Sequence, residues 1–219
     1  MTSKPTRAIV MISGRGSNLQ AILDAIDKKI LSLDICAVVS SRCDARGLEL
    51  AKMKSIATHC VDNNDYADRE SYDQALLTTM EPYRADLIIM AGFMRILTPV
   101  FIQHYQGKIL NIHPSLLPKY RGLNTHQRAL DNHEQEHGAS VHFVTAELDG
   151  GPIIIQSRVP VLDNDNADSL SQRVLHQEHK IYQLAIKWFT EGRVEMIGNT
   201  AYLDGIALQK PYEFKEAIE

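Results

Sequence analysis

Short runs that are apolar almost throughout recur in the first half of the chain and limit the folds it can adopt. Residues 7–13 read RAIVMIS and residues 85–92 read ADLIIMAG. A strand with one face in water alternates apolar and polar side chains, whereas a strand of a parallel sheet covered on both faces does not. The segments between these runs have helical character. This alternation predicts βαβ units, and hence an α/β fold with a doubly wound, mostly parallel, Rossmann-like sheet.

The second half of the chain follows a different pattern. Two strand-like runs, residues 138–148 and 151–161, meet at an Asp-Gly-Gly sequence, and they predict an antiparallel hairpin added at the far side of the sheet. A long helix is expected from about Ala167 to Glu191, followed by a short strand and loop from Gly198. Because no repeat, low-complexity segment or flexible linker interrupts residues 1–219, we expect a single domain.

Composition and charge narrow the range of partners. The 219 residues are 44% hydrophobic, and they carry a formal net charge of −4 without any run of basic residues, which argues against a general nucleic-acid surface. No apolar run approaches the length that spans a bilayer, and the amino-terminal one is too short for a signal peptide. We therefore expect a cytoplasmic protein that binds neither nucleic acid nor membrane.

The cysteines and histidines do not form a recognisable metal-binding pattern. Cys36, Cys43 and Cys60 lack CxxC spacing, and Cys36 and Cys60 fall in strand-like runs, so buried free thiols in a reducing compartment are expected. The nine histidines include no HxxxH on a predicted helix and no cluster with cysteine. No metal is therefore expected.

A glycine turn between the first predicted strand and the first predicted helix is a candidate anion site. Glycines permit the sharp turn, and the free amides at a helix N-terminus attract phosphate. A dinucleotide-binding motif needs a third small residue in the turn and an acidic residue after the second strand. Positions 19 and 20 are Leu and Gln, and the second predicted strand ends in serines, so a monophosphate is favoured over a dinucleotide. The alternative is a tight turn before a capped helix. The residues concerned are Gly14, Arg15, Gly16, Ser17 and Asn18.

Polar side chains end a predicted strand at residues 108–113. Asn111 and His113 are two residues apart, so strand alternation puts both on one face, and Pro114 then ends the strand. Each could simply cap a turn, and Asp149, at the hairpin tip, could be an ordinary turn residue. Together, however, an amide, an imidazole and a carboxylate are the minimum for moving a proton and stabilising an oxyanion.

Glu178 lies on the apolar stripe of the long predicted helix. That stripe follows a 4-3-4-3 spacing through Val174, Glu178, Ile181, Ala185 and Trp188. A carboxylate that faces inward is costly unless it is paired. Glu178 is therefore expected to meet either a substrate hydroxyl or a buried cation with a purely structural role.

Four segments of the chain together resemble the phosphoribosylglycinamide formyltransferase family, the folate-dependent enzymes of purine biosynthesis. They are GRGSNLQAI, AGFMRILTP, LNIHPSLLPKY and HGASVHFVTAELDGGPIIIQ, at residues 14–22, 91–99, 110–120 and 137–156. The Asn-x-His-Pro-Ser-Leu-Leu-Pro run, a following Thr-His pair and the Leu-Asp-Gly-Gly-Pro element are the specific part. The resemblance covers nearly the whole chain.

The resemblance implies roles for individual residues. Asn111, His113 and Asp149 match the catalytic trio of the family, which transfers a formyl group from 10-formyltetrahydrofolate to glycinamide ribonucleotide without a metal. Residues 14–18 match the loop that holds the substrate phosphate, and Glu178 a carboxylate on the ribose hydroxyls. The positions that match folate-binding residues are Arg69, Met94, Arg95, Ile96, Leu97 and Val144.

Some positions depart from the family pattern. Arg15 stands where some relatives carry Asn, so it is expected to contribute mainly its backbone amide. Arg121 and Asn124 stand where others carry Pro and His, so the loop from Ser115 to Thr125 is expected to move or close differently. A monomer or a homodimer is expected.

Three other functions share parts of these motifs. Methionyl-tRNA formyltransferase is expected to need a further carboxy-terminal domain and a basic surface, and formyltetrahydrofolate deformylase a further amino-terminal domain. A non-catalytic nucleotide-binding module would need only the turn at residues 14–18. The trio Asn111, His113 and Asp149 favours an enzyme, and the length and net charge favour the ribonucleotide formyltransferase.

Overall fold

The structure is a computed structural model that describes residues 4–215, and these residues form two compact units. The first unit extends to Asn111 and the second begins at Ile112. The prediction of a single domain across residues 1–219 stays a prediction.

The first unit is built on a parallel sheet whose strand order is β5-β4-β1-β2-β3. β1 and β4 are buried over most of their length, which confirms that both faces of the sheet are covered. The strands are β1 (Thr6–Ile12), β2 (Leu33–Ser40), β3 (Ala57–Cys60), β4 (Leu87–Met90) and β5 (Ile109–His113), the last ending in the second unit.

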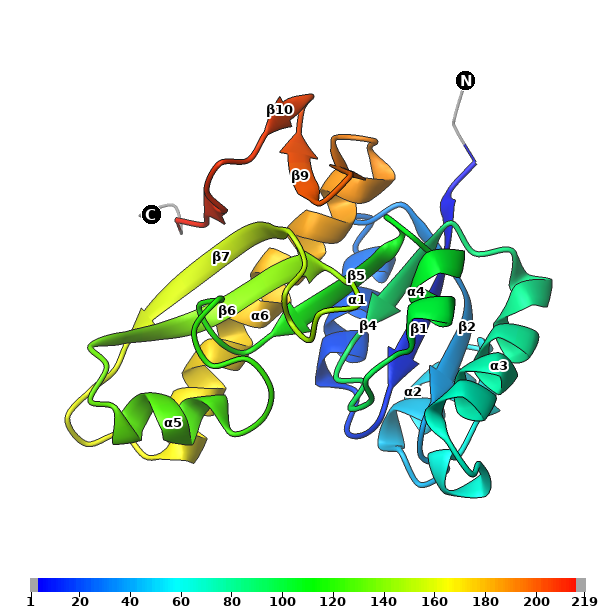
Figure 1. Cartoon of the computed structure of the whole chain (residues 1–219), viewed down its shortest axis with the longest axis horizontal. Coiled ribbons are helices and arrows are strands. Elements are labelled where there is room, and N and C mark those ends of the chain that lie inside the picture. Colours follow the sequence, from blue (N-terminus) through cyan, green and yellow to red (C-terminus); the bar gives the residue numbers. More distant parts are fainter. Residues whose placement is uncertain (1–3, 216–219) are drawn as a thin grey trace. The chain divides into compact units, whose positions relative to one another are not determined.

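The helices of the first unit lie on both faces of this sheet, as predicted. The chain moves outward from β1 to β3 and then returns to the other side of β1 for β4 and β5. Because such crossovers are right-handed, this reversal puts α1 and α2 on one face and α3 and α4 on the other, as Figure 1 shows. The helices are α1 (Ser17–Asp27), α2 (Arg46–Met53), α3 (Arg69–Met80) and α4 (Pro99–His104), with 3₁₀ turns η1 (Asn63–Asp65) and η2 (Glu81–Tyr83).

The second unit contains the predicted hairpin and the predicted long helix. β6 (Glu136–Phe143) pairs antiparallel with β7 (Ile153–Pro160), and β11 (Tyr212–Glu213) runs parallel to β7. Helix α6 (Ala167–Thr190) packs against both β6 and β7. Helix α5 (Thr125–Asp131) was not predicted from the sequence. The tail forms a small antiparallel sheet of β8 (Val194–Ile197), β9 (Thr200–Leu203) and β10 (Ile206–Ala207).

The prediction of buried free thiols was wrong for two of the three cysteines. Cys43 and Cys60 are exposed and form a disulfide, with their Cα atoms 5.2 Å apart. Cys36 is the free thiol, and it is only half-buried. The sequence separation of 17 residues did not suggest this pair. The two cysteines meet because the loop after β2 and the end of β3 lie at the same edge of adjacent parallel strands.

Within residues 4–215 every helix is too short or too polar to cross a bilayer. The longest, α6, instead has one buried stripe that includes Val174, Ile181 and Ala185, as its spacing predicted. Its first turn is held by a capping box, in which Asn166 and Ser169 exchange side-chain-to-backbone hydrogen bonds.

Asp165 ties the loop before α6 to the helix itself. Arg173 donates to both carboxylate oxygens of Asp165, at 2.6 and 2.8 Å, and the Leu162 amide and the Ser169 hydroxyl also donate to this carboxylate. The Asp165 side chain is 2% exposed. The hydrogen bonds from Arg173 lower the pKa of Asp165 well below its usual range.

Asp165→Asn should lower the free energy of unfolding by about 1–3 kcal/mol at pH 7. Since the folded-state pKa of Asp165 is lowered, its contribution is fully present above the unfolded pKa, near pH 4, and is lost as pH falls below it. Urea unfolding of both proteins between pH 3 and pH 7 measures the difference. Asp163→Asn, an exposed change in the same loop, is the control. A difference that stays constant down to pH 3 would contradict this role.

Candidate functional site

The turn between β1 and α1 adopts a conformation that only a glycine accommodates easily. Gly16, the N-cap of α1, has φ +80°, and a Cβ at this position would lie 2.8 Å from the Gly47 Cα. The Gly47 amide donates to the Gly14 carbonyl at 3.1 Å. The segment that begins α2 therefore packs directly behind the turn, and the N-terminal amides of α1 begin at Ser17.

Ser13 links this turn to the segment after β4. The Ser13 and Ser41 hydroxyl oxygens are 2.6 Å apart in a buried hydrogen bond, and the Met94 amide donates to the Ser13 Oγ at 2.9 Å. β1 and β4 are neighbours at the point where the strand order reverses. In open α/β sheets ligands bind outside the carboxyl ends of the strands at such a point. There the Met94 amide bonds to Ser13, the residue directly before the turn at residues 14–18.

The segment 94–97 presents apolar side chains in an extended stretch before α4. Met94 is 65% and Ile96 48% exposed, whereas Leu97 is buried. The stretch ends at Thr98, whose amide donates to the buried carboxylate of Asp73 on α3 at 2.5 Å. Burial raises the pKa of Asp73. Arg69, at the start of α3, lies one helical turn before Asp73 on the same side of the helix.

In the second unit, His113 and Asp149 form a pair that is largely hidden from water. The His113 Nδ1 lies 3.5 Å from the Asp149 Oδ2, and the two side chains are 7% and 10% exposed. The other ring nitrogen, Nε2, donates to the Tyr120 carbonyl at 2.9 Å. His113 is the last residue of β5, two residues after Asn111, as the predicted alternation requires.

His142 on β6 completes this cluster. Its Nε2 lies 3.8 Å from the Asp149 Oδ1, and its Nδ1–H donates to the Phe143 carbonyl at 2.8 Å. Burial lowers the pKa of His142, which favours the neutral ring. His142 is buried on β6, and its position next to the Asp149 carboxylate gives it a supporting role in this cluster.

The chain geometry around Asp149 follows from the connection between β6 and β7, which covers residues 144–152, so the first strand ends earlier than the predicted run at residues 138–148. Asp149 has φ +47°, and a Cβ at Gly151 would lie 1.9 Å from the Phe143 carbonyl oxygen, so only glycine fits there. The Asp149 Oδ2 accepts a hydrogen bond from the Gly122 amide at 2.8 Å. Val144 immediately follows β6, at the start of the same connection.

The loop between β5 and α5 is anchored at several points. The Thr125 hydroxyl donates to the Pro114 carbonyl at 2.6 Å, and the Ser140 hydroxyl donates to the Ser115 carbonyl at 2.6 Å. Arg121 forms an ion pair with Glu147. Asn124, the N-cap of α5, has φ +57°. Arg121 thus ties this loop to the β6–β7 connection beside Gly122, whose amide bonds to Asp149.

The structure gathers the predicted residues into groups within each unit. In the first unit the segment 94–97 is linked to Ser13, the residue before the turn at residues 14–18. In the second unit His113 and Asp149 form a pair, and Val144 lies in the same connection as Asp149. Glu178 is 8% exposed on the buried stripe of α6. Sequence reasoning missed Ser13, Asp73, Tyr120 and Gly122. Of these four, only Ser13 could have been found, because a serine directly after a buried strand is unusual. The others act through hydrogen bonds with backbone atoms, and residue type does not predict such bonds.

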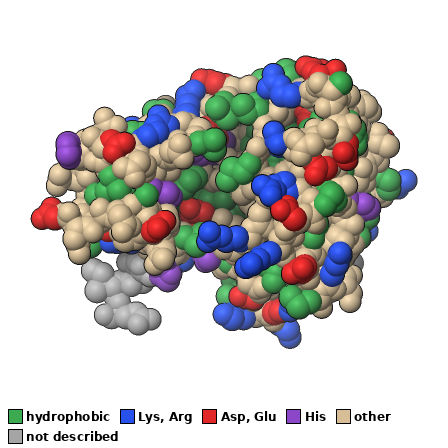
Figure 2. Space-filling view, turned by 90° about the horizontal axis from the view of Figure 1, so that it is seen from below, with side chains coloured by type: hydrophobic (Ala, Val, Ile, Leu, Met, Phe, Trp, Pro, Cys, Tyr) green, Lys and Arg blue, Asp and Glu red, His purple; other side chains and the backbone are tan. Residues whose placement is uncertain are grey.

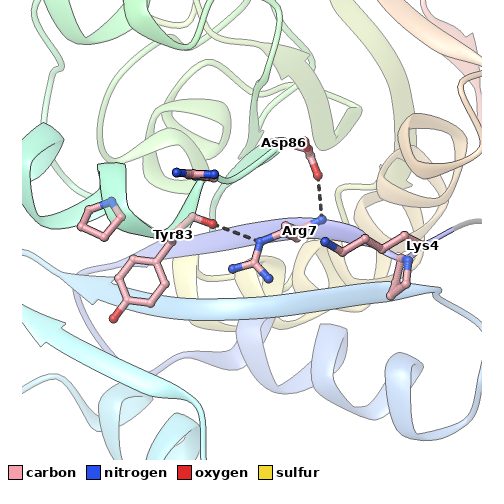
Figure 3. A pocket seen from close by; sticks show the side chains of 7 residues that line it. Lys4, Arg7, Tyr83 and Asp86 are labelled. Atoms are coloured by element: carbon pink, nitrogen blue, oxygen red, sulfur yellow. Dashed lines mark hydrogen bonds between the residues drawn. The ribbon is translucent and has the colours of Figure 1, made fainter.

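A cavity of about 460 Å³ lies elsewhere in the first unit. Figure 3 shows Arg7 at its centre, donating through its backbone amide to Asp86 and through Nε to the Tyr83 carbonyl. Arg7 and Asp86 lie at the amino ends of β1 and β4, opposite the edge where ligands bind in such sheets. The cavity therefore has no part in the candidate site.

Comparison with known proteins gives consistent matches over most of the chain. The model of the family described as formyl transferase matches residues 6–186. A phosphoribosylglycinamide formyltransferase of Escherichia coli is 53% identical over 90% of this chain and 93% of its own length, and that of Haemophilus influenzae is 47% identical over 92% and 95%. The structure of the Coxiella burnetii enzyme of that name superposes with a TM-score of 0.92, at 46% identity, covering 96% of this chain and all of that one.

A more distant structure carries the name of one of the alternatives. A formyltetrahydrofolate deformylase of Pseudomonas syringae has a TM-score of 0.85 at 26% identity, covering 92% of this chain and 66% of that one. Its lower identity ranks it behind the formyltransferases as a guide to this chain.

Ser13→Ala should lower the free energy of unfolding by about 1–3 kcal/mol, because it leaves the Met94 amide and the Ser41 hydroxyl without their buried partner. Amide hydrogen exchange at Met94 should become faster in the variant. Urea unfolding and exchange mass spectrometry measure the two effects. Ser32→Ala, a change at an exposed position, is the control. Unchanged exchange at Met94 would show that Ser13 does not hold this segment.

Proposed function

Because the chain belongs to the formyl transferase family, we propose that it transfers the formyl group of 10-formyltetrahydrofolate to the amine of glycinamide ribonucleotide. The products are formylglycinamide ribonucleotide and tetrahydrofolate, in the pathway of purine synthesis. The observation that carries the proposal is the His113–Asp149 pair, a nearly buried imidazole and carboxylate 3.5 Å apart at the end of the strand that also bears Asn111. A module that only bound a nucleotide would not need this pair.

The proposed reaction needs donors for a developing negative charge. The amine nitrogen attacks the formyl carbon, and the carbonyl electron pair moves to oxygen to give a tetrahedral oxyanion. The Asn111 amide donates a hydrogen bond to this oxyanion, and protonated His113 does the same. The carbon–nitrogen bond to folate then breaks, its electron pair stays on the folate nitrogen, and a proton is delivered there while the attacking amine loses one.

Asp149 acts by charge and by proton transfer. Its carboxylate faces His113 and stabilises the imidazolium that donates to the oxyanion. Because the His113 Nε2–H is bonded to the Tyr120 carbonyl here, that nitrogen reaches the substrate only if the loop at residues 115–125 shifts. Gly122, bonded to Asp149, moves with the same loop. Loop movement then exposes both catalytic groups together, consistent with the expectation from Arg121 and Asn124.

The remaining residues are proposed to bind the two substrates. The backbone amides of residues 14–18 and the positive end of α1 hold the ribonucleotide phosphate, and buried Glu178 accepts hydrogen bonds from the ribose hydroxyls. The exposed side chains of Met94 and Ile96 offer apolar contact to the pterin ring, with Arg95, Leu97 and Val144 beside them. Arg69 is proposed to pair with the folate glutamate carboxylate. No metal is proposed to take part.

The proposed partners are these two small molecules rather than nucleic acid or membrane. The net charge is −4, and on the face seen in Figure 2 basic and acidic side chains are interspersed. A nucleic-acid surface would instead concentrate positive charge. A cytoplasmic location and a monomeric or homodimeric state complete the proposal.

Incubation of the protein with both substrates tests the function directly. We expect 10-formyltetrahydrofolate to be consumed, by absorbance, only when glycinamide ribonucleotide is present, with formylglycinamide ribonucleotide appearing by mass spectrometry in equal amount. Loss of the formyl group without the ribonucleotide would identify the deformylase instead. Binding of the ribonucleotide without any turnover would identify a binding module.

Asn111→Ala should lower kcat about 10²–10³-fold, the usual cost of losing one oxyanion donor. The fold should persist, which circular dichroism checks, and KM for the ribonucleotide should change little because the contact forms in the transition state. Asn164→Ala, at an exposed position in the loop before α6, is the matched control. Turnover within a few-fold of the parent would contradict the role of Asn111.

A further inference from the structure

The Cys43–Cys60 disulfide ties down a loop that leads into the segment packed against the turn proposed to bind phosphate. Cys43 lies in the loop between β2 and α2, and Cys60 is the last residue of β3. Both residues are exposed, so a dissolved thiol can reach the bond. In cytoplasmic proteins of mesophiles a disulfide is usually transient, and it is then catalytic or redox-sensing rather than purely structural. The position of this bond in the loop after β2 suggests which binding site its redox state can affect.

The loop that carries Cys43 forms the back of the turn at residues 14–18. Two residues before Cys43, Ser41 bonds to the end of β1 through its amide, at 3.1 Å from the Ile12 carbonyl oxygen, and through its hydroxyl to Ser13. Four residues after Cys43, the Gly47 amide donates to the Gly14 carbonyl. Cys43 therefore lies between two points, Ser41 and Gly47, at which its loop is hydrogen-bonded to the phosphate turn or to the residues just before that turn.

The disulfide supplies the third anchor of this loop. β3 is the outermost strand of the first unit, and its end is joined to the β2 end by the Val61 amide, which donates to the Ser40 carbonyl at 2.9 Å. Linking Cys43 to Cys60 ties the loop to this second strand end. Without the link, the span from Arg42 to Arg46 keeps its contacts with β2 and the phosphate turn, including the hydrogen bonds between the Arg42 backbone and the Ser40 hydroxyl, but it loses its covalent tie to the end of β3. The close approach of Gly16 to Gly47 transmits any displacement to the turn.

We propose that Cys43 and Cys60 form a redox-modification site that controls ribonucleotide binding. The oxidised pair holds the loop firmly against the phosphate turn, and reduction loosens the loop and weakens phosphate binding. This inference rests on the proposed function, since it takes residues 14–18 as the phosphate site.

The chemistry is thiol–disulfide exchange with a dithiol, either a small molecule or a redox protein. One thiolate of the dithiol attacks a sulfur of the Cys43–Cys60 bond, forming a mixed disulfide and releasing one protein thiolate. The second thiol of the reagent then displaces the other cysteine. In total the reagent gives up two electrons and two protons and becomes a disulfide, and the protein gains two thiols. A disulfide reagent drives the reverse reaction.

The reduced pair also has a carboxylate close by, which the experiment must take into account. Within residues 4–215, Cys43, Cys60 and Asp62 are the one group of cysteine, histidine and acidic side chains whose ligand atoms lie within 4.8 Å of one another. Two thiolates and a carboxylate suit zinc. A chelator in every buffer therefore keeps trace metal from holding the reduced pair together in place of the disulfide.

The test compares oxidised and reduced full-length protein in chelator. Alkylation and intact mass should find one modified cysteine after treatment with a disulfide reagent and three after treatment with a dithiol. On reduction, KM for glycinamide ribonucleotide should rise about three- to tenfold, the scale of couplings carried by a single supporting contact. KM for 10-formyltetrahydrofolate and kcat should stay within about twofold. Calorimetry with the ribonucleotide alone should give the same loss of affinity.

Variants separate the disulfide from other effects of reductant. Cys43→Ser with Cys60→Ser should bind the ribonucleotide as the reduced parent does, and should not respond to dithiol. Cys36→Ser, which keeps a donor toward the Ala8 carbonyl, should respond as the parent does. Its response shows that the remaining thiol is not responsible.

Two results would overturn the inference: three alkylated cysteines after oxidation, or equal ribonucleotide affinity of the oxidised and reduced forms. The calorimetric arm needs no turnover, so it distinguishes the two proposals. A protein that binds the ribonucleotide in a redox-dependent way but transfers no formyl group would refute the proposed function and support the redox site. Formyl transfer with the same KM for the ribonucleotide in both redox states would support the proposed function and refute the redox site.

Discussion

The pairing of β1 with both β2 and β4 is the constraint on which the first unit depends. Because the chain reverses direction across the sheet at β1, the connections that leave β1 and β4 diverge toward opposite faces and leave an open edge between them. The turn at residues 14–18 and the segment 94–97 lie at that edge. Ser13, directly before the turn, accepts a hydrogen bond from the Met94 amide and shares another with the Ser41 hydroxyl. Buried hydrogen bonds of this kind are costly to lose, so they keep the edge in one arrangement.

The second unit depends on the connection between β6 and β7. At Gly151 this connection approaches the Phe143 carbonyl and leaves no room for a side chain, and at Asp149 its backbone has a positive φ. This geometry turns the Asp149 carboxylate toward His113 and His142. The same carboxylate accepts the Gly122 amide, so the position of one loop and the surroundings of His113 are linked through a single side chain.

Much of this arrangement was predictable because it follows from periodicity. The apolar runs predicted the parallel strands, the Asp-Gly-Gly sequence predicted the hairpin, and the stripe through Glu178 predicted the buried face of α6. The contacts that support the site were not predictable. Asp73 reaches the Thr98 amide across 25 residues, and the Tyr120 carbonyl reaches His113 across a loop. Such bonds join side chains to backbone groups. Because every residue has backbone groups, no pattern of residue types predicts these bonds.

The sequence by itself determined the parallel strands, the hairpin and the long helix, their order, and the side-chain types at the candidate site, since each of these depends on local side-chain type and spacing. It could not determine which distant residues meet. The Cys43–Cys60 bond shows the difference, because two cysteines that looked like separate thiols became partners only once β2 and β3 were aligned in register. The physical reason is that strand register and crossover direction are properties of the whole sheet, and they decide which strand ends lie next to each other. They bring together atoms that no short stretch of sequence relates.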